Sequence, residues 1–194
     1  FCKSKRAAKR VKESITRFIE GKLHLKVNRD KTVVSYVQGV KYLGYSFYVM
    51  KGKCQLTVHP KAKAKMKAKL KELTSRSNGW GYAKRKQKLE EYIKGWVGYY
   101  HLANMKRFLI ETDEWLRRRL RMCIWKSWKR VKTRVANLVK CGIDKYQAYM
   151  WGNSRLGYWR IAGSYILSRA ITNEKLSMAG YATLMGSYIE WHPK

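Results

Sequence analysis

The side chains in this sequence that are best suited to binding chemistry are clustered basic and aromatic residues. Between Trp115 and Arg130, four arginines occupy five successive positions, and lysines and tryptophans follow them. The planar fork of a guanidinium group binds phosphate, and an indole ring offers a plate for base stacking. A core helix with a solvated basic back is the alternative, but uncompensated charge of this density destabilises a fold. We therefore predict nucleic-acid contacts for Arg117, Arg118, Arg119, Arg121, Lys126, Lys129 and Arg130.

A second basic cluster is a row of lysines at every other position between residues 61 and 71. The alternation superficially resembles a strand, but the intervening residues are helix formers. They place an apolar stripe at helical spacing on Ala62, Met66, Leu70 and Leu73. A helix with this stripe carries lysines on all its other sides and repels itself unless phosphates lie nearby. RNA binding is therefore predicted for Lys61, Lys63, Lys65, Lys67, Lys69 and Lys71.

A third cluster lies between residues 153 and 160. Arg155, Trp159 and Arg160 accompany an amide and a tyrosine there. These side chains suit recognition of RNA shape or stacking on an unpaired base. A purely structural role fits the same residues equally well.

Catalytic and metal-binding patterns are missing from the sequence. Neighbouring residues on a helix point about 100° apart, so the adjacent carboxylates Glu90-Glu91 and Asp113-Glu114 make poor two-metal clamps. The four cysteines and four histidines are scattered, so we expect no metal site and no disulfide framework, which fits a reducing cytoplasm. No apolar run reaches the ~18 residues of a membrane span. We expect a binding protein without a cofactor of its own and without a membrane partner.

Composition supports a folded protein that binds a polyanion. The 44 Lys and Arg residues outnumber 12 Asp and Glu, giving a formal net charge of +32. Nucleic acid is the commonest partner for such a charge, and an anionic membrane surface is a distant second. Hydrophobic residues make up 45% of the chain, which is enough for a packed core and excludes a disordered basic tail.

The elements that must position these clusters divide into three stretches. In residues 1–58, Ser4 caps an expected helix that ends near Gly21, and strands are expected at 23–28, 32–37 and 40–49. A turn at 51–53 then leads into a hairpin strand at 54–58. Residues 59–130 and 131–194 read as helical, with Asp144 and Thr172 as helix N-caps. The predicted fold class is therefore α+β, mostly α.

Several segments together resemble the group II intron-encoded reverse transcriptase/maturase family. Residues 25–32 (Leu-Lys-Val-Asn-Arg-Asp-Lys-Thr) are similar to its sixth reverse-transcriptase block, with Val27 in place of a leucine. Residues 40–47 resemble the seventh block, which is the primer-grip hairpin. Residues 95–100 and 115–121 resemble the thumb, called domain X, and residues 157–162 and 167–169 resemble the C-terminal maturase region. The resemblance implies the end of a palm at 1–58, a helical thumb at 59–130 and a nucleic-acid-binding region at 131–194.

The resemblance also implies roles for single residues. Lys31 matches a lysine thought to protonate the leaving pyrophosphate, and Tyr42, Leu43 and Gly44 would position the primer end. The family's Tyr-Ala-Asp-Asp turn, which holds two Mg²⁺ ions, is absent and is expected just before Phe1. The intact parent would thus be an RNA-directed DNA polymerase, whereas this chain is expected to be inactive alone and to hold no Mg²⁺ itself.

Three functions remain open on these grounds. The first is an RNA-binding maturase fragment that holds group II intron RNA in its self-splicing fold, while the RNA with its own Mg²⁺ performs the transesterifications. The second is one part of a split RNA-directed DNA polymerase, completed by a separate N-terminal fragment and acting on primer-template or target DNA. The third is a general basic nucleic-acid-binding protein.

Overall fold

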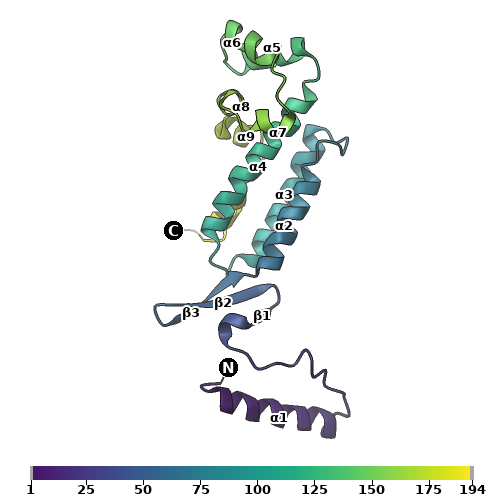
Figure 1. The fold of residues 1–194 in the computed structure, drawn as a ribbon, viewed down its shortest axis with the longest axis vertical. Helices are drawn as coiled ribbons and strands as arrows, with labels where there is room; N and C mark the ends of the chain where they lie inside the picture. The colour runs from purple at the N-terminus through teal and green to yellow at the C-terminus, as the bar shows by residue number, and fades with distance from the viewer. Residues whose placement is uncertain (1, 193–194) are drawn as a thin grey trace. The chain divides into compact units, whose positions relative to one another are not determined.

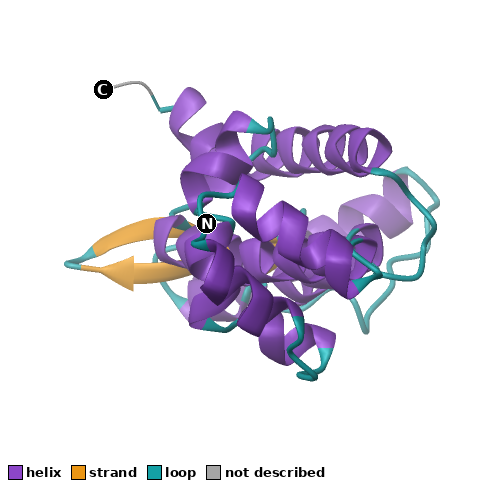
Figure 2. Cartoon of the chain, turned by 90° about the horizontal axis from the view of Figure 1, so that it is seen from above, coloured by secondary structure: helices purple, strands orange, loops and turns teal. Residues whose placement is uncertain are grey.

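The computed structural model describes residues 2–192 and divides the chain into two compact units, residues 1–59 and residues 60–194. Helices dominate, and a three-stranded antiparallel sheet makes up the remainder of the regular structure (Figures 1 and 2). The predicted class, α+β and mostly α, is confirmed. The assignment of the three stretches to palm, thumb and C-terminal region stays a prediction. No described helix is long and apolar enough to cross a membrane.

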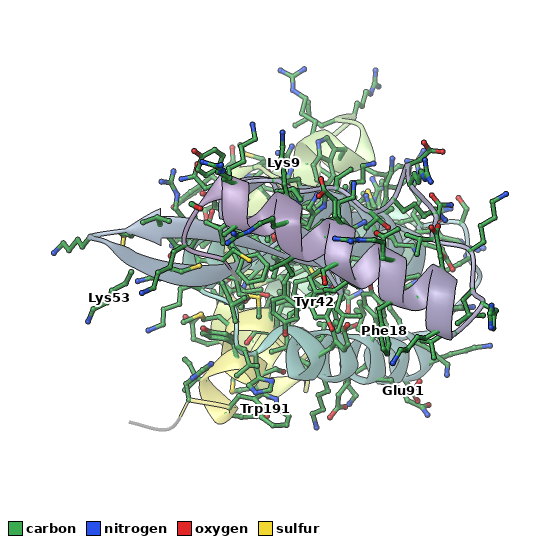
Figure 3. All side chains as sticks on the ribbon, turned by 90° about the horizontal axis from the view of Figure 1, so that it is seen from below. Lys9, Phe18, Tyr42, Lys53, Glu91 and Trp191 are labelled. Atoms are coloured by element: carbon green, nitrogen blue, oxygen red, sulfur yellow. The ribbon has the colours of Figure 1, made fainter. Side chains whose placement is uncertain are left out.

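The first unit opens with helix α1 (Lys5–Lys22), which begins as predicted at Ser4. The Ser4 hydroxyl accepts a hydrogen bond from the backbone N–H of Ala7, satisfying a donor that the helix itself leaves unpaired. No residue of α1 is buried, and its apolar positions Val11, Ile15 and Phe18 are about half exposed. Figure 3 shows Lys9 of this helix extending away from the ribbon.

The strands predicted at 23–28 and 32–37 are wrong. No described strand pairs with either segment, and a strand without a ladder partner leaves its backbone groups to other bonds. Here Asn28 directs a turn instead. Its side-chain oxygen accepts from the backbone N–H of Lys31, and its carbonyl accepts from the Thr32 hydroxyl. The 3₁₀-helix η1 (Val37–Gly39) follows.

The sheet of this unit consists of β1 (Lys41–Tyr42), β2 (Tyr45–Met50) and β3 (Lys53–Val58), in that order. The predicted hairpin between β2 and β3 is confirmed, with Met50 paired to Lys53 across a two-residue turn. Lys51 and Gly52 in that turn both have positive φ, as a primed turn requires. Leu43 and Gly44 form the equivalent turn between β1 and β2.

The second unit is built on α2 (Pro60–Leu73), α3 (Tyr82–Tyr100) and α4 (Lys106–Ser127), which pack side by side (Figure 1). The predicted stripe of α2 is confirmed, since Met66, Leu70 and Leu73 are buried. The face that α3 buries includes Leu89, Ile93 and Val97, and α4 buries Leu116, Leu120 and Cys123. Helix α4 runs without interruption through the arginine-rich segment.

Six shorter helices follow in the described part of the second unit, and two of them start at the predicted caps. Asp144 accepts from the N–H groups of Tyr146 and Gln147, and Thr172 accepts from that of Lys175. In chain order the helices are α5 (Val131–Lys140), α6 (Lys145–Gly152), α7 (Tyr158–Ala162), α8 (Tyr165–Ala170), α9 (Asn173–Met178) and α10 (Leu184–Glu190). Helix α7 packs on α4, and α10 packs on both α3 and α4.

Candidate nucleic-acid interface

The lysine row of α2 surrounds the buried stripe. Its members differ in whether their ammonium groups have a partner inside the protein. Lys65 and Lys71 are exposed, and neither ammonium group has a hydrogen-bond or ion-pair partner in the described part of the chain. Lys69 pairs with Glu72 on the same helix, at 2.7 Å between Nζ and Oε1. An exposed pair of this kind contributes at most about 1 kcal/mol, so a phosphate can replace the carboxylate at little cost.

Two lysines of the row lie against an aromatic ring of α4. Nζ of Lys63 is 4.9 Å from the centroid of the Phe108 ring, and Nζ of Lys67 is 5.5 Å from it. Burial lowers the pKa of Lys63, while the charge of Glu111 acts in the opposite direction. Because both Nζ atoms lie within about 6 Å of the ring centroid, a cation–π interaction with Phe108 orients the two ammonium groups on this side of α2.

The arginines of α4 make more contacts within the protein than the sequence predicts. Arg119 reaches the C-terminal end of α2: its Nε donates to the Thr74 hydroxyl at 2.5 Å, and its Nη2 donates to the carbonyls of Lys71 and Thr74 at 3.0 Å. A cation at this position also complements the negative end of the helix dipole. Arg119 is thus a cap for α2 as well as a candidate RNA contact.

Arg121 and Arg118 tie α4 to the C-terminal helices. Nε of Arg121 donates to the carbonyl of Ile171 at 2.8 Å, and Nη2 donates to the side chain of Asn173 at 2.9 Å. Arg118 donates from Nη2 to the carbonyl of Trp159 at 2.9 Å, and its guanidinium lies 4.1 Å from the centroid of the Trp159 ring. Two predicted clusters, far apart in sequence, therefore meet at this contact.

Arg117 differs from its three neighbours. Among residues 2–192 its guanidinium forms no hydrogen bond or ion pair. Hydrogen bonds from the Glu174 backbone and the Thr172 side chain lower the pKa of Glu174, and the charge of Arg117 adds to that shift; the same charge opposes the rise in the pKa of Asp113. It is partly exposed. Of the four arginines it is the one whose donors are least committed inside the protein.

The basic residues that follow the arginine cluster lie at the C-terminal end of α4. Nζ of Lys126 donates to the carbonyl of Arg76 at 2.9 Å, which joins α4 to the loop between α2 and α3. Lys129 and Arg130 are exposed. In the third cluster Arg155 and Arg160 are also exposed, and Trp159 is 40% exposed despite its contact with Arg118.

The predicted primer-grip residues lie in the first unit. Tyr42 ends β1 and Leu43 lies in the β1–β2 turn, both with side chains about two-thirds exposed, and Gly44 in the same turn has a φ of 83°. Lys31 is exposed in the turn that Asn28 organises. Their predicted roles stay predictions, because they depend on a palm and a primer.

Sequence reasoning missed the basic residues around the α2–α3 loop. Arg85 on α3 is buried, and its Nη2 donates to the side chain of Asn78 and the carbonyl of Trp80. The guanidinium of Arg76 lies 5.0 Å from the centroid of the Tyr158 ring. The signal in the sequence was a basic residue inside a Ser-, Asn- and Gly-rich loop, a position where binding residues are common.

Acidic residues in the described part of the chain do not assemble a metal site. No three His, Cys, Asp or Glu side chains between residues 2 and 192 come together in a way that could hold a metal ion. The buried carboxylate of Asp113 instead accepts from the backbone N–H groups of Leu184 and Met185, at 2.8 and 2.9 Å, at the start of α10. The carboxylates between residues 2 and 192 therefore do not fit a two-Mg²⁺ clamp.

Part of the second unit matches a known protein family. Residues 63–142 match the family model described as group II intron, maturase-specific domain. The matched region begins within the lysine row of α2, includes all of α3, α4 and α5, and ends at Gly142. A comparison with curated proteins finds no significant match.

Proposed function

The chain is a group II intron maturase-type protein, and from this premise we propose that it binds group II intron RNA and promotes splicing of that RNA. The observation that carries the proposal is the uncompensated charge of the second unit. The second unit carries 30 Lys and Arg against 9 Asp and Glu, so 21 positive charges would remain on it even if every carboxylate neutralised a different cation. The matched region contains the arginine cluster and every lysine of the row except Lys61.

The proposed interface combines two kinds of contact. Exposed lysines such as Lys65 and Lys71 neutralise backbone phosphates as mobile point charges. Arginines fixed by contacts inside the protein, such as Arg118 and Arg119, present their remaining N–H groups in a set orientation. Fixed donors favour one arrangement of phosphates over others, because a misplaced phosphate cannot reach them without losing the internal contacts.

Promotion of splicing follows from selective binding. A protein that binds the splicing-competent RNA fold more tightly than competing folds shifts the population toward it by its difference in affinity. A tenfold preference corresponds to about 1.4 kcal/mol. In this proposal the protein supplies binding energy, and the bond-breaking chemistry stays with the RNA.

Competition binding tests this function. A labelled, folded group II intron RNA is bound to the protein at low ionic strength and is displaced by unlabelled folded intron, by a denatured and rapidly cooled intron, or by duplex DNA of equal phosphate content. We expect the folded intron to compete at least about tenfold better than either rival. Equal competition by duplex DNA would show a general basic nucleic-acid-binding protein instead.

A further inference from the structure

A pocket of about 370 Å³ opens between the α2–α3 loop, the first turn of α3 and the C-terminal end of α4. Its lining includes Arg76, Trp80, Tyr82, Arg85, Lys126 and Lys129, and we call it the Arg85 pocket. No carboxylate is among its lining residues. Four cations and two aromatic rings therefore surround one cavity of small-molecule size.

The charge of Arg85 is the feature that requires explanation. Its side chain is buried, and its hydrogen-bond acceptors, the Asn78 amide oxygen and the Trp80 carbonyl, are both neutral. Its Nε is enclosed and has no hydrogen-bond partner. No ion pair formed among residues 2–192 involves Arg85. A buried cation without a counter-ion is costly, and an anion in the pocket would compensate it.

The surrounding contacts hold the pocket in shape without an anion. Lys126 donates to the Arg76 carbonyl, and the hydroxyl groups of Tyr82 and Ser127 are hydrogen-bonded to each other across the α3–α4 side. The amide oxygen of Asn78 accepts from both Arg85 and the backbone N–H of Trp80. Because these contacts already fix the loop and the two helices, an anion can bind in the pocket without the entropic cost of ordering the loop.

We propose that the Arg85 pocket binds one unpaired nucleotide of the RNA, with its phosphate among the four cations and its base against Trp80 and Tyr82. The volume admits a nucleotide but not a duplex, and double-stranded RNA is recognised by shape along its grooves rather than by insertion. Stacking on aromatic side chains is tolerant of sequence, so the pocket selects unpaired over paired nucleotides rather than one base over another.

This inference rests on the proposed function, and photocrosslinking separates the two. Single-stranded RNA carrying 5-iodouridine is irradiated with the whole 194-residue chain, and the crosslinked peptide is identified by mass spectrometry. We expect crosslinks at Trp80 or Tyr82, displaced by unlabelled single strands and not by a perfect duplex of equal concentration. Folded intron RNA that binds normally while single strands leave residues 76–82 unmodified would overturn the pocket alone. A protein that binds no intron RNA would overturn the proposed function.

Variants sharpen the test. Arg76→Gln with Lys129→Gln removes two pocket charges, and Lys132→Gln with Lys145→Gln removes two exposed charges elsewhere as the matched control. The crosslink should disappear in the first pair and persist in the second. Trp80→Ala should weaken single-strand binding by roughly fivefold to 150-fold, as expected for one stacked base, while Trp80→Phe should restore most of it. Equal crosslinking of the two double variants would show that the Arg85 pocket does not bind the nucleotide. Equal affinity of Trp80→Ala and wild type for single strands would show the same.

Discussion

The guanidinium of Arg118 lies over the indole of Trp159 and donates to the carbonyl oxygen of the same residue, so that one side chain of α4 holds the start of α7 by two kinds of contact. The neighbouring Arg119 and Arg121 likewise donate from Nε and Nη2 to other elements. A guanidinium has five N–H donors. Donors thus remain on each arginine for phosphate, and structural and binding roles coexist in one side chain.

Replacing Arg119 should therefore destabilise the fold. Arg119→Gln removes hydrogen bonds to the end of α2 and leaves the Lys71 and Thr74 carbonyls without their charged donor. A hydrogen bond from a charged group contributes about 1.5–3 kcal/mol, and we expect a loss of that order in the free energy of unfolding from urea titration. Lys129→Gln, which removes an exposed charge, should change it by less than about 0.5 kcal/mol. Equal stability of the two variants would mean that Arg119 does not cap α2.

The buried Asp113 makes stability depend on pH. Burial raises the pKa of Asp113, although the N–H groups of Leu184 and Met185 and the charge of Arg117 oppose the rise. Because its pKa is higher in the folded than in the unfolded state, the folded protein binds this proton more tightly. Its contribution to the free energy of unfolding is greatest below the unfolded-state pKa and falls as the pH rises through the folded-state pKa.

Asp113→Asn isolates that contribution. The free energy of unfolding of wild type minus that of the variant should decrease as the pH rises from about 3 to 7, because the other titrating groups largely cancel in the difference. Urea midpoints measured across this range give the difference directly. A difference that stays constant, or that grows with pH, would contradict the raised pKa. Asp113→Ala, which removes both acceptors from α10, should cost about 1–3 kcal/mol.

Local patterns in the sequence predicted most of the helical unit. The spacing of Met66, Leu70 and Leu73 gave the buried face of α2, and Asp144 and Thr172 marked helix starts, because capping and periodicity depend on neighbours in sequence. The strand predicted at 23–28 failed for the opposite reason. Alternation is a local signal, whereas a strand requires a partner that its own sequence does not specify.

The candidate interface was predictable in residue type but not in detail. Arg118, Arg119 and Arg121 were identified from their charge, but their acceptors lie 41 to 52 positions away in sequence. Which helix end approaches which arginine depends on tertiary packing. The same holds for Arg85, which looks like any surface arginine of an amphipathic helix until α3 packs against its neighbours and buries it.

The segment between α1 and the sheet should be the first site of proteolysis. Residues 23–36 contain no helix or strand, and Val33 and Tyr36 are 70% and 81% exposed. Proteases cleave exposed irregular backbone before packed helices. Brief digestion with chymotrypsin, followed by mass spectrometry, should give a fragment that begins between residues 24 and 37 and retains all of α2 to α10. First cleavage within α3 or α4 would contradict this order of local stability.

The lysine row should determine the salt dependence of RNA binding. Each phosphate neutralised contributes about −0.9 to the slope of log K against log salt on duplex nucleic acid and about −0.7 on single strands. Lys65→Gln with Lys71→Gln should therefore make the slope shallower by ~1.4–1.8 and weaken binding at low salt. Lys132→Gln with Lys140→Gln on α5 removes the same charge from exposed positions outside the predicted clusters and should leave the slope nearly unchanged. If both pairs shift the slope equally, the protein attracts RNA through its net charge alone, and α2 is not a defined contact surface.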